Sequence, residues 1–311
     1  MTAVRVVLGY FHPWPNDAGL FAALAGGHYA RAGLDVELRV ADPLRGDALE
    51  YLARGEADFA LCPTNRLLAR RERGERLTGV AAINHRAMET VQTVTDTAIT
   101  RPSELAGRRV AYNPTPRGIA MVRHLVRSDG GDPDSLITVD SGVRELSVDD
   151  IAAGEVDATF GGYWAWDALF GSLPPERRVV WPVDEISGLR YHSYLLAAQE
   201  STLAQSPGLV RAFVAASAFG YAAAESDQEA TLALLERVIP YFPREIIRRS
   251  LALLAPSWTH AGRWGEQREE LLAGYSLWLA ENGVIGSPEV WREAVSNAFL
   301  PGLAEDGWAR G

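Results

Sequence analysis

The opening stretch decides the fold: the apolar run Val4-Arg-Val-Val-Leu-Gly-Tyr10, the alanine-rich segment Gly19–Ala32 and the run Asp35-Val-Glu-Leu-Arg-Val40 follow one another. The first and third pieces are short and rich in β-branched residues, which favours strands. The middle piece is typical of a helix, and Gly33 is a suitable residue to end it. A strand–helix–strand order of this kind predicts a parallel sheet with crossover helices.

The alternation continues beyond this stretch. A helix around Gly46–Arg54, a strand at Asp58–Cys62, an arginine-rich helix and a strand at Thr78–Ile83 complete a first βαβαβ pattern. A second begins near Val91. Its predicted elements are a helical turn at Pro102–Gly107, strands at Arg109–Asn113, Leu136–Val139 and Ala158–Gly161, and helices at Ile119–Ser128 and Ser147–Ala153.

After a return segment at Tyr191–Ala198, the chain has apolar residues at helical spacing only. Helices are predicted at Pro207–Ala224, Gln228–Val238, Arg244–Leu254, Gly265–Glu281 and Pro288–Ala298. We therefore predict an α/β protein of two lobes. Residues 1–90 form the first part of lobe I, 91–190 form lobe II, and 191–311 complete lobe I with the C-terminal helices. The two crossovers are expected near Ala87–Thr93 and Ser187–Tyr194.

Composition excludes several classes of function. The 311 residues include 40 acidic and 30 basic ones, and the net charge of −10 argues against nucleic acid as a partner. Every basic residue is an arginine, which excludes lysine chemistry such as Schiff-base catalysis or covalent attachment of pyridoxal phosphate. Cys62 is the single cysteine, and the six histidines lack metal-binding spacing. We expect no metal and no cofactor.

The chain shows neither a membrane span nor a secretory signal pattern. No stretch approaches the ~20 apolar residues that a span requires. The N-terminus has only a short apolar run before His12 and Pro13, without a following cleavage site. Two locations stay open: cytoplasmic if the chain as given is native, and extracytoplasmic (periplasmic or cell-surface) if a signal was removed.

Several motifs occur in a characteristic order, and they cover nearly the whole chain. They are Phe11-His-Pro-Trp-Pro-Asn-Asp-Ala-Gly-Leu20, Gly55-Glu-Ala-Asp-Phe-Ala60, Pro102-Ser-Glu-Leu-Ala-Gly-Arg-Arg-Val-Ala-Tyr112, Gly154-Glu-Val-Asp-Ala158 and Gly162-Tyr-Trp-Ala-Trp-Asp167. This order resembles a type II periplasmic-binding-protein family, and in particular the solute-binding proteins of ABC transporters for thiamine pyrimidine precursors, which are related to the fungal pyrimidine synthase. The family's opening tryptophan and histidine fall on Phe11 and Asp17. The resemblance implies a two-lobed type II fold that closes on a ligand by hinge motion.

A ligand is expected at the carboxyl ends of the parallel strands, where loops converge between the lobes. Tyr163, Trp164 and Trp166 offer stacking faces for a flat heterocycle, and Asp167 can accept hydrogen bonds from a ring amine. Core packing with a helix-terminal carboxylate is the alternative interpretation. The candidate ligand-binding residues are Phe11, Trp14, Asn16, Thr64, Asn84, Asn113, Arg117, Gly118, Tyr163, Trp164, Trp166 and Asp167.

Other roles compete for several of these residues. Asn16 or Asp17 could simply cap the helix from Gly19, and Asn65 could cap the next one. The Pro114–Gly118 loop could present backbone N–H groups to an anion, with Arg117 as a bidentate partner, or Arg117 could be a solvated surface residue. Residues Arg70–Arg76 are expected to form a solvated helix face, and Cys62 a small buried side chain.

These observations predict a monomeric solute-binding protein that captures a planar nitrogen heterocycle and delivers it to an ABC permease. An alternative hypothesis is that the protein is a cytoplasmic enzyme of the same fold that acts in pyrimidine, cofactor or natural-product biosynthesis. The enzyme relatives use a pyridoxal-phosphate lysine and a cysteine-rich iron segment, and this chain has neither. The pattern is also compatible with a binder of an organic anion such as a sulfonate, and with a ligand sensor that takes no part in transport.

Overall fold

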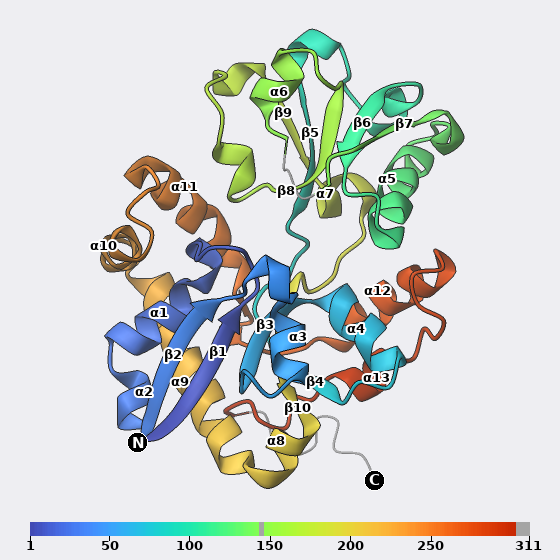
Figure 1. Ribbon diagram of the computed structural model, residues 1–311. Helices are drawn as coiled ribbons and strands as arrows, with labels where there is room; N and C mark the ends of the chain where they lie inside the picture. The colour runs from blue at the N-terminus through green and yellow to red at the C-terminus, as the bar shows by residue number, and fades with distance from the viewer. Residues whose placement is uncertain (143–145, 303–311) are drawn as a thin grey trace. The chain divides into compact units, whose positions relative to one another are not determined.

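The computed structural model describes residues 1–142 and 146–302 (Figure 1). The chain divides into two compact units. Unit 1 contains Met1–Arg86, Tyr191–Trp278 and the segment from Ile285 onward, and unit 2 contains Ala87–Arg190 and Leu279–Val284. Residues 191–311 are predicted to complete lobe I, and of these Leu279–Val284 group with unit 2 in the structure.

Unit 1 is built on a five-stranded sheet in the order β2-β1-β3-β10-β4. Strands β1 and β3 are parallel to each other, and β10 runs antiparallel between β3 and β4. The carboxyl ends of β1, β3 and β4 therefore lie at the same edge of the sheet, which we call the carboxyl edge of unit 1. The strands are β1 (Thr2–Leu8), β2 (Leu34–Val40), β3 (Phe59–Pro63), β4 (Leu77–Ala82) and β10 (Tyr194–Gln199).

Helices cover both faces of this sheet, with α3 and α4 in front and α9 behind in the view of Figure 1. Side chains of β3 alternate between the two layers: Phe59 stacks on Phe213 of α9 with ring centroids 4.2 Å apart, while Cys62 joins the apolar cluster under α3. The helices of unit 1 include α1 (Ala18–Ala25), α2 (His28–Arg31), α3 (Ala48–Ala53), α4 (Thr64–Glu72), α8 (Glu200–Gln205), α9 (Pro207–Ser226), α10 (Gln228–Val238), α11 (Arg244–Leu254) and α13 (Trp291–Ala294).

Two departures from the predicted elements of unit 1 have local causes. The helix predicted over Gly19–Ala32 is interrupted at Gly26-Gly27, and Gly27 adopts a left-handed conformation with φ 69°. The helix predicted to begin at Gly265 begins later in the structure. A small hairpin of β11 (Thr259–His260) and β12 (Arg263–Trp264) precedes it. Helix α12 (Glu269–Glu281) begins after this hairpin, and its last turn belongs to unit 2.

Helices α1 and α9 pack very closely, because glycine lies on both contacting faces. A Cβ placed on Gly220 would lie 2.0 Å from the carbonyl oxygen of Gly19. A Cβ on Gly19 would lie 2.2 Å from the ring of Tyr221, which is fully buried. Neither distance leaves room for a side chain, so this close approach requires glycine at both positions.

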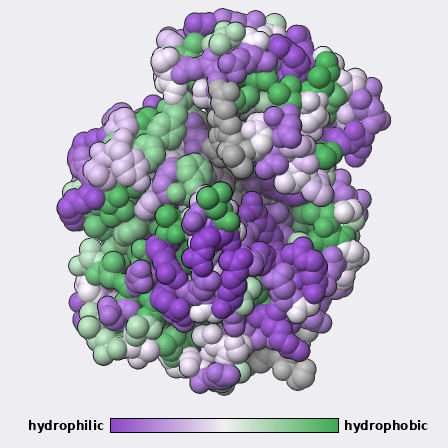
Figure 2. All heavy atoms as spheres, in the orientation of Figure 1, coloured by the Kyte–Doolittle hydropathy of each residue, from purple (hydrophilic) through white to green (hydrophobic). Residues whose placement is uncertain are grey.

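The arginine-rich helix α4 forms ion pairs rather than a freely solvated face. The side chain of Arg70 is 14% exposed and bonds Asp47, Glu50 and Glu75 at 3.2, 2.9 and 2.9 Å. The neighbouring Arg71 pairs with Glu200. The expectation of a solvated face is therefore wrong for these two arginines, although the surface over α3 and α4 is strongly hydrophilic (Figure 2).

Unit 2 contains a second five-stranded sheet, in the order β7-β6-β8-β5-β9. Strand β6 is parallel to β7 and β8, whereas β5 runs antiparallel to both β8 and β9. Strands β5 and β9 are not among the strands predicted from the sequence. The strands are β5 (Glu89–Val94), β6 (Arg109–Tyr112), β7 (Ile137–Asp140), β8 (Ala158–Tyr163) and β9 (Arg178–Pro182), and the α-helices are α5 (Pro116–Ser128), α6 (Val148–Ala152) and α7 (Val183–Ser187).

No described helix of either unit is long and apolar enough to cross a membrane.

Candidate functional site

The carboxyl edge of unit 1 brings together the loop after β1, the start of α4 and the residues after β4. These segments contain five of the candidate ligand-binding residues, which are Phe11, Trp14, Asn16, Thr64 and Asn84. In sheets of this kind, ligands bind outside the carboxyl ends of the strands. Residues far apart in the sequence thus meet at the edge where a site is expected.

Asn16 and Asn84 form a fully buried amide pair within this edge. Asn16 Nδ2 donates to Asn84 Oδ1 at 3.1 Å, and Asn84 Nδ2 donates to Asn16 Oδ1 at 2.8 Å. Asn84 Nδ2 also reaches Ser257 Oγ at 3.0 Å, and Trp258 Nε1 donates to Asn16 Oδ1 at 3.2 Å. Both side chains therefore join the loop after β1 to the end of β4 and to the segment after α11.

The two aromatic residues predicted in the loop after β1 differ in exposure. Trp14 is 1% exposed and packs against Tyr10 and Tyr194, with ring centroids 5.5 and 6.3 Å away. Phe11 is 56% exposed and lies on Tyr10 at 4.0 Å. Phe11 can thus offer a ring face to a ligand, whereas Trp14 supports the loop from beneath.

Asp17 lies at the start of α1 but does not cap that helix through its side chain. Its Oδ2 accepts the backbone N–H of Trp14 at 3.1 Å, which closes the turn of the preceding loop. The carboxyl group is fully buried, and its Oδ1 has no hydrogen-bond partner. Desolvation penalises the charged form and raises the pKa of Asp17 to about 8. The interpretation of Asp17 as a cap for this helix is therefore wrong.

Three histidines lie close together near the end of β4. The ring centroid of His85 lies 5.0 Å from that of His192 and 5.8 Å from that of His260. His192 Nε2 accepts the backbone N–H of Arg268, so its Nδ1 donates to the carbonyl of Asn84 at 2.8 Å. Burial lowers the pKa of His85 to about 3 and that of His192 to about 4, so both rings are neutral at pH 7.

These histidines do not make a metal centre. Across residues 1–142 and 146–302, no group of three or more His, Cys, Asp or Glu side chains could hold a metal ion. Cys62 is buried in the apolar cluster under α3, and its Sγ lies 3.7 Å from the carbonyl oxygen of Leu195. Burial raises the pKa of this thiol far above its ordinary value.

In unit 2, the side chains of the Gly162–Asp167 motif differ in burial: some are buried and others are partly accessible. Trp164 donates from Nε1 to the carbonyl of Ala87 at 3.0 Å, and Trp166 is fully buried with its ring 5.1 Å from that of Phe170. The two tryptophans pack in the interior of unit 2. Tyr163 is half-buried, and Asp167 Oδ2 accepts its backbone N–H at 3.1 Å.

Glu89 joins this group, although its sequence context gives no sign of it. Glu89 opens β5 and lies opposite Tyr163, the last residue of β8, in the antiparallel ladder. Its Oε1 is 2.7 Å from Nη2 of Arg117, and each side chain is only 13% exposed. Only the strand register brings Glu89 here, and sequence spacing carries no signal of that register. We call Glu89, Arg117, Tyr163 and Asp167 the polar cluster of unit 2.

The loop before α5 is partly closed by hydrogen bonds within the chain. Pro116 and Arg117 already belong to the first turn of α5, and Thr115 Oγ1 accepts the N–H of Gly118 at 3.1 Å as a helix cap. A Cβ on Gly118 would lie 2.5 Å from the carbonyl of Asn113, so the residue is needed for this close turn. The cap therefore uses one of the N–H groups that this loop is predicted to present to an anion, that of Gly118. Asn113 itself is exposed.

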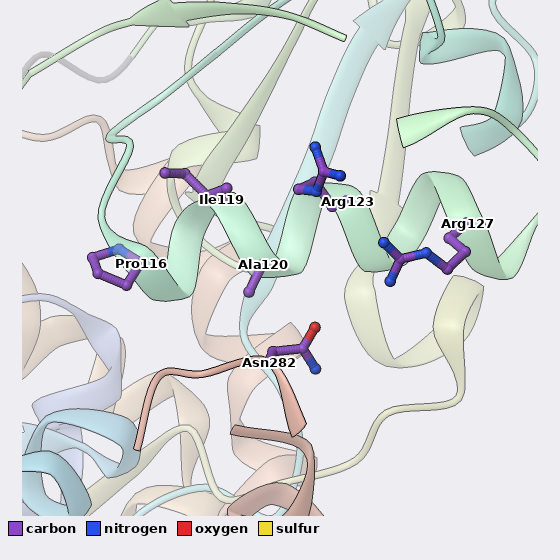
Figure 3. Close-up of a pocket in the computed structure, with 6 residues that line it drawn as sticks. All are labelled: Pro116, Ile119, Ala120, Arg123, Arg127 and Asn282. Carbon is purple, nitrogen blue, oxygen red and sulfur yellow. The ribbon is translucent and has the colours of Figure 1, made fainter. Parts of the chain in front are cut away.

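A cavity of about 280 Å³ lies along α5, and all of its lining residues belong to unit 2. Figure 3 shows Ala120 and Asn282 facing each other across it, with Arg123 and Arg127 further along the helix. Arg123 is paired with Asp134. None of the predicted ligand-binding residues lines this cavity.

Comparison with known proteins agrees with this architecture. A curated relative, the formylaminopyrimidine-binding protein of Halalkalibacterium halodurans, is 24% identical over 309 residues, which cover 96% of this chain and 90% of the relative. The periplasmic aliphatic sulphonate binding protein SsuA of Escherichia coli has a TM-score of 0.68 at 15% identity, covering 100% of this chain and 97% of SsuA. The desulfurization enzyme DSZB has a TM-score of 0.67 at 17% identity, covering 96% of this chain and 98% of DSZB.

The fold is thus that of the periplasmic binding proteins, as predicted. The family model described as NMT1/THI5 like matches residues 14–231, more than half of the chain. The chain belongs to the NMT1/THI5-like family.

Proposed function

We propose that this chain captures a small planar nitrogen heterocycle of the aminopyrimidine class. The observation that carries the proposal is the polar cluster of unit 2, where the half-buried Tyr163 pairs with Glu89 across the strands and donates its backbone N–H to the carboxylate of Asp167. An aromatic ring with carboxylate acceptors suits a flat ligand that bears amino groups and ring N–H donors. The relative that binds formylaminopyrimidine supports the same ligand class.

The same cluster favours an amine over a sulfonate. An anion needs a cationic partner, and the guanidinium of Arg117 is already paired with Glu89 at 2.7 Å. A sulfonate would have to compete with Glu89 for that guanidinium. A ligand rich in N–H donors can instead donate to Asp167 and leave the pair of Arg117 and Glu89 intact.

We further propose that the ligand contacts both units, through Phe11 of unit 1 and through Tyr163 and Asp167 of unit 2. Contacts with both units stabilise the ligand-bound conformation relative to the free one, which is the thermodynamic basis of hinge closure. In this proposal, the chain acts as a monomer on the outer side of a membrane and delivers its ligand to an ABC permease. No cofactor takes part.

The substitution Asp167→Asn tests the ligand assignment. It keeps the shape of the side chain but replaces an acceptor oxygen with a donor, so a ligand amine loses a charge-assisted hydrogen bond worth about 1.5–3 kcal/mol. Calorimetry should show binding of 4-aminopyrimidine weakened by roughly 10- to 150-fold. Asp132→Asn is the matched control. Asp132 caps the short helix Pro133–Ser135, and asparagine caps equally well.

An unchanged affinity in Asp167→Asn would show that this carboxylate does not orient the ligand. An equal loss in Asp132→Asn would assign the effect to the lowered net charge instead. An enzyme is the second candidate, because DSZB shows that this fold also supports catalysis. Consumption of 4-aminopyrimidine by the purified protein above the rate in buffer would favour the enzyme.

A further inference from the structure

Glu89 and Arg117 form an ion pair that is largely shielded from solvent within unit 2. Oε1 of Glu89 lies 2.7 Å from Nη2 of Arg117, and each side chain is 13% exposed. By contrast, the side chain of Arg101 in its pair with Asp129 of the same unit is 57% exposed. Desolvating two charges costs free energy that can exceed their mutual attraction, so stability alone does not account for a shielded pair.

The pair lies at the edge of the unit 2 sheet where a ligand is expected. Strands β6 and β8 are parallel, so their carboxyl ends lie at the same edge. Glu89 lies opposite Tyr163 at the end of β8, and Arg117 belongs to the first turn of α5, which a short loop separates from the end of β6. Ligands of such sheets bind outside the carboxyl ends of the parallel strands. Both charged side chains therefore come from segments at this edge.

The carboxylate of Glu89 determines how this edge interacts with a charged ligand. A sulfonate or carboxylate group is bound most strongly by a guanidinium that donates two parallel hydrogen bonds. Glu89 competes for the N–H donors of Arg117, and its negative charge repels an incoming anion. An uncharged ligand that donates N–H groups meets neither obstacle. Replacing this one carboxylate with an amide raises the electrostatic potential at Arg117 while it keeps the shape of the side chain.

We propose that Glu89 is a specificity-determining residue of this site, which excludes organic anions by occupying the guanidinium of Arg117. The inference rests on the proposed function in placing the ligand at the polar cluster of unit 2, and it deepens that function by naming the residue that selects the ligand class. Glu89 holds Arg117, whereas the N–H donors of the ligand bind Asp167. Loss of the Glu89 charge therefore opens the site to organic anions.

The substitution Glu89→Gln tests this inference by calorimetry on the full chain, with ethanesulfonate as the probe. The variant should bind ethanesulfonate about 10- to 100-fold more tightly than the unchanged protein, because it lacks a negative charge close to the anion. In the double variant Glu89→Gln/Arg117→Gln this gain should disappear, because the guanidinium that binds the anion is absent. Glu176→Gln is the matched control, since it removes the same charge at an exposed position of unit 2, in the short helix Pro175–Arg177. Binding of 4-aminopyrimidine by the unchanged protein tests the proposed function separately.

Thermal unfolding shows whether each variant is folded, and Glu89→Ala, which also removes the charge, takes the place of Glu89→Gln if that variant does not fold. No gain for ethanesulfonate in the folded variant would overturn the inference. An equal gain in Glu176→Gln would assign the effect to net charge, and a gain that survives in the double variant would show that Arg117 does not bind the anion, so either result overturns it as well. A gain in Glu89→Gln, with no binding of 4-aminopyrimidine by the unchanged protein, would instead reject the proposed function and leave the role of Glu89 standing.

Discussion

At the scale of single residues, Asp17 shows how burial changes the protonation of a carboxyl group. Its pKa is about 8 in the folded protein, far above the ordinary value of an aspartate. Between these two values the folded state binds more protons than the unfolded state, so this group makes stability fall as pH rises. In the unchanged protein, this group lowers the free energy of unfolding by a few kcal/mol between about pH 4 and pH 8, and Asp17→Asn should remove that decrease. Urea unfolding at pH 5.5, 7.0 and 8.5 measures it, and parallel curves for the two proteins would contradict the assignment.

The pKa of His85 shifts in the opposite direction to that of Asp17, so its effect on the pH dependence of stability is also opposite. Its pKa is lowered to about 3, mainly by burial, and both of its ring nitrogens lack hydrogen-bond partners. The unfolded state therefore binds the extra proton, and stability is lost as pH falls below about 6.5. His85→Leu sacrifices no side-chain hydrogen bond and should be less sensitive to acid. The difference in unfolding free energy between the two proteins should change in favour of the variant from pH 7.5 to pH 4.5. A constant difference would show that His85 does not carry the acid sensitivity.

The residues of the candidate site also show what sequence reasoning can supply. The motifs of Phe11, Tyr163 and Asp167 follow predicted strands, and the structure places these residues at or just after strand ends. Asn16 and Asn84 are predicted as ligand residues, but nothing in their spacing indicates that they bond each other. Glu89 escapes prediction because its place opposite Tyr163 depends on register, which becomes fixed only when the strands pair.

At the scale of elements, strong helical periodicity predicts α10 and α11 with the bounds that the structure has. Strand β9 escapes prediction because it is short and half-buried throughout, and its residues show no alternation of apolar and polar side chains. Strand β5 comes directly after the crossing from unit 1, where no helix separates it from β4. Alternation of strands and helices, which predicts the other strands of unit 2, therefore carries no signal for these two.

The contact between α1 and α9 leads to a prediction about stability. Gly220→Ala places a methyl group 2.0 Å from the carbonyl oxygen of Gly19, so the helices must separate. Overpacking of this kind costs about 1–3 kcal/mol and sometimes more. Gly274→Ala in α12 is the control, since a Cβ there meets nothing within 4 Å and should stabilise the helix by about 0.5–1 kcal/mol. Similar unfolding free energies for the two variants would contradict the close approach.

At the scale of the whole molecule, the proposed contacts with both units predict how two substitutions combine. Phe11→Ala in unit 1 and Asp167→Asn in unit 2 should each weaken binding of 4-aminopyrimidine. The two side chains share the ligand as a partner and stabilise the same ligand-bound conformation, so their effects are expected to couple rather than to add. In calorimetry the double variant should therefore lose more binding free energy than either single variant but less than the sum of the two. A double variant no weaker than Asp167→Asn alone would show that Phe11 does not contact the ligand.

The burial of Cys62 has a practical consequence for measuring motion. The thiol lies in the core of unit 1 with a strongly raised pKa, so thiol-reactive dyes should leave the folded protein unlabelled and modify it only after unfolding. Cysteines introduced at the exposed positions Leu44 in unit 1 and Ile137 in unit 2 would then be the only labelled sites. A donor and an acceptor dye at these positions would test the proposed hinge closure directly, because energy transfer between them reports whether the distance between the two units changes when ligand is added.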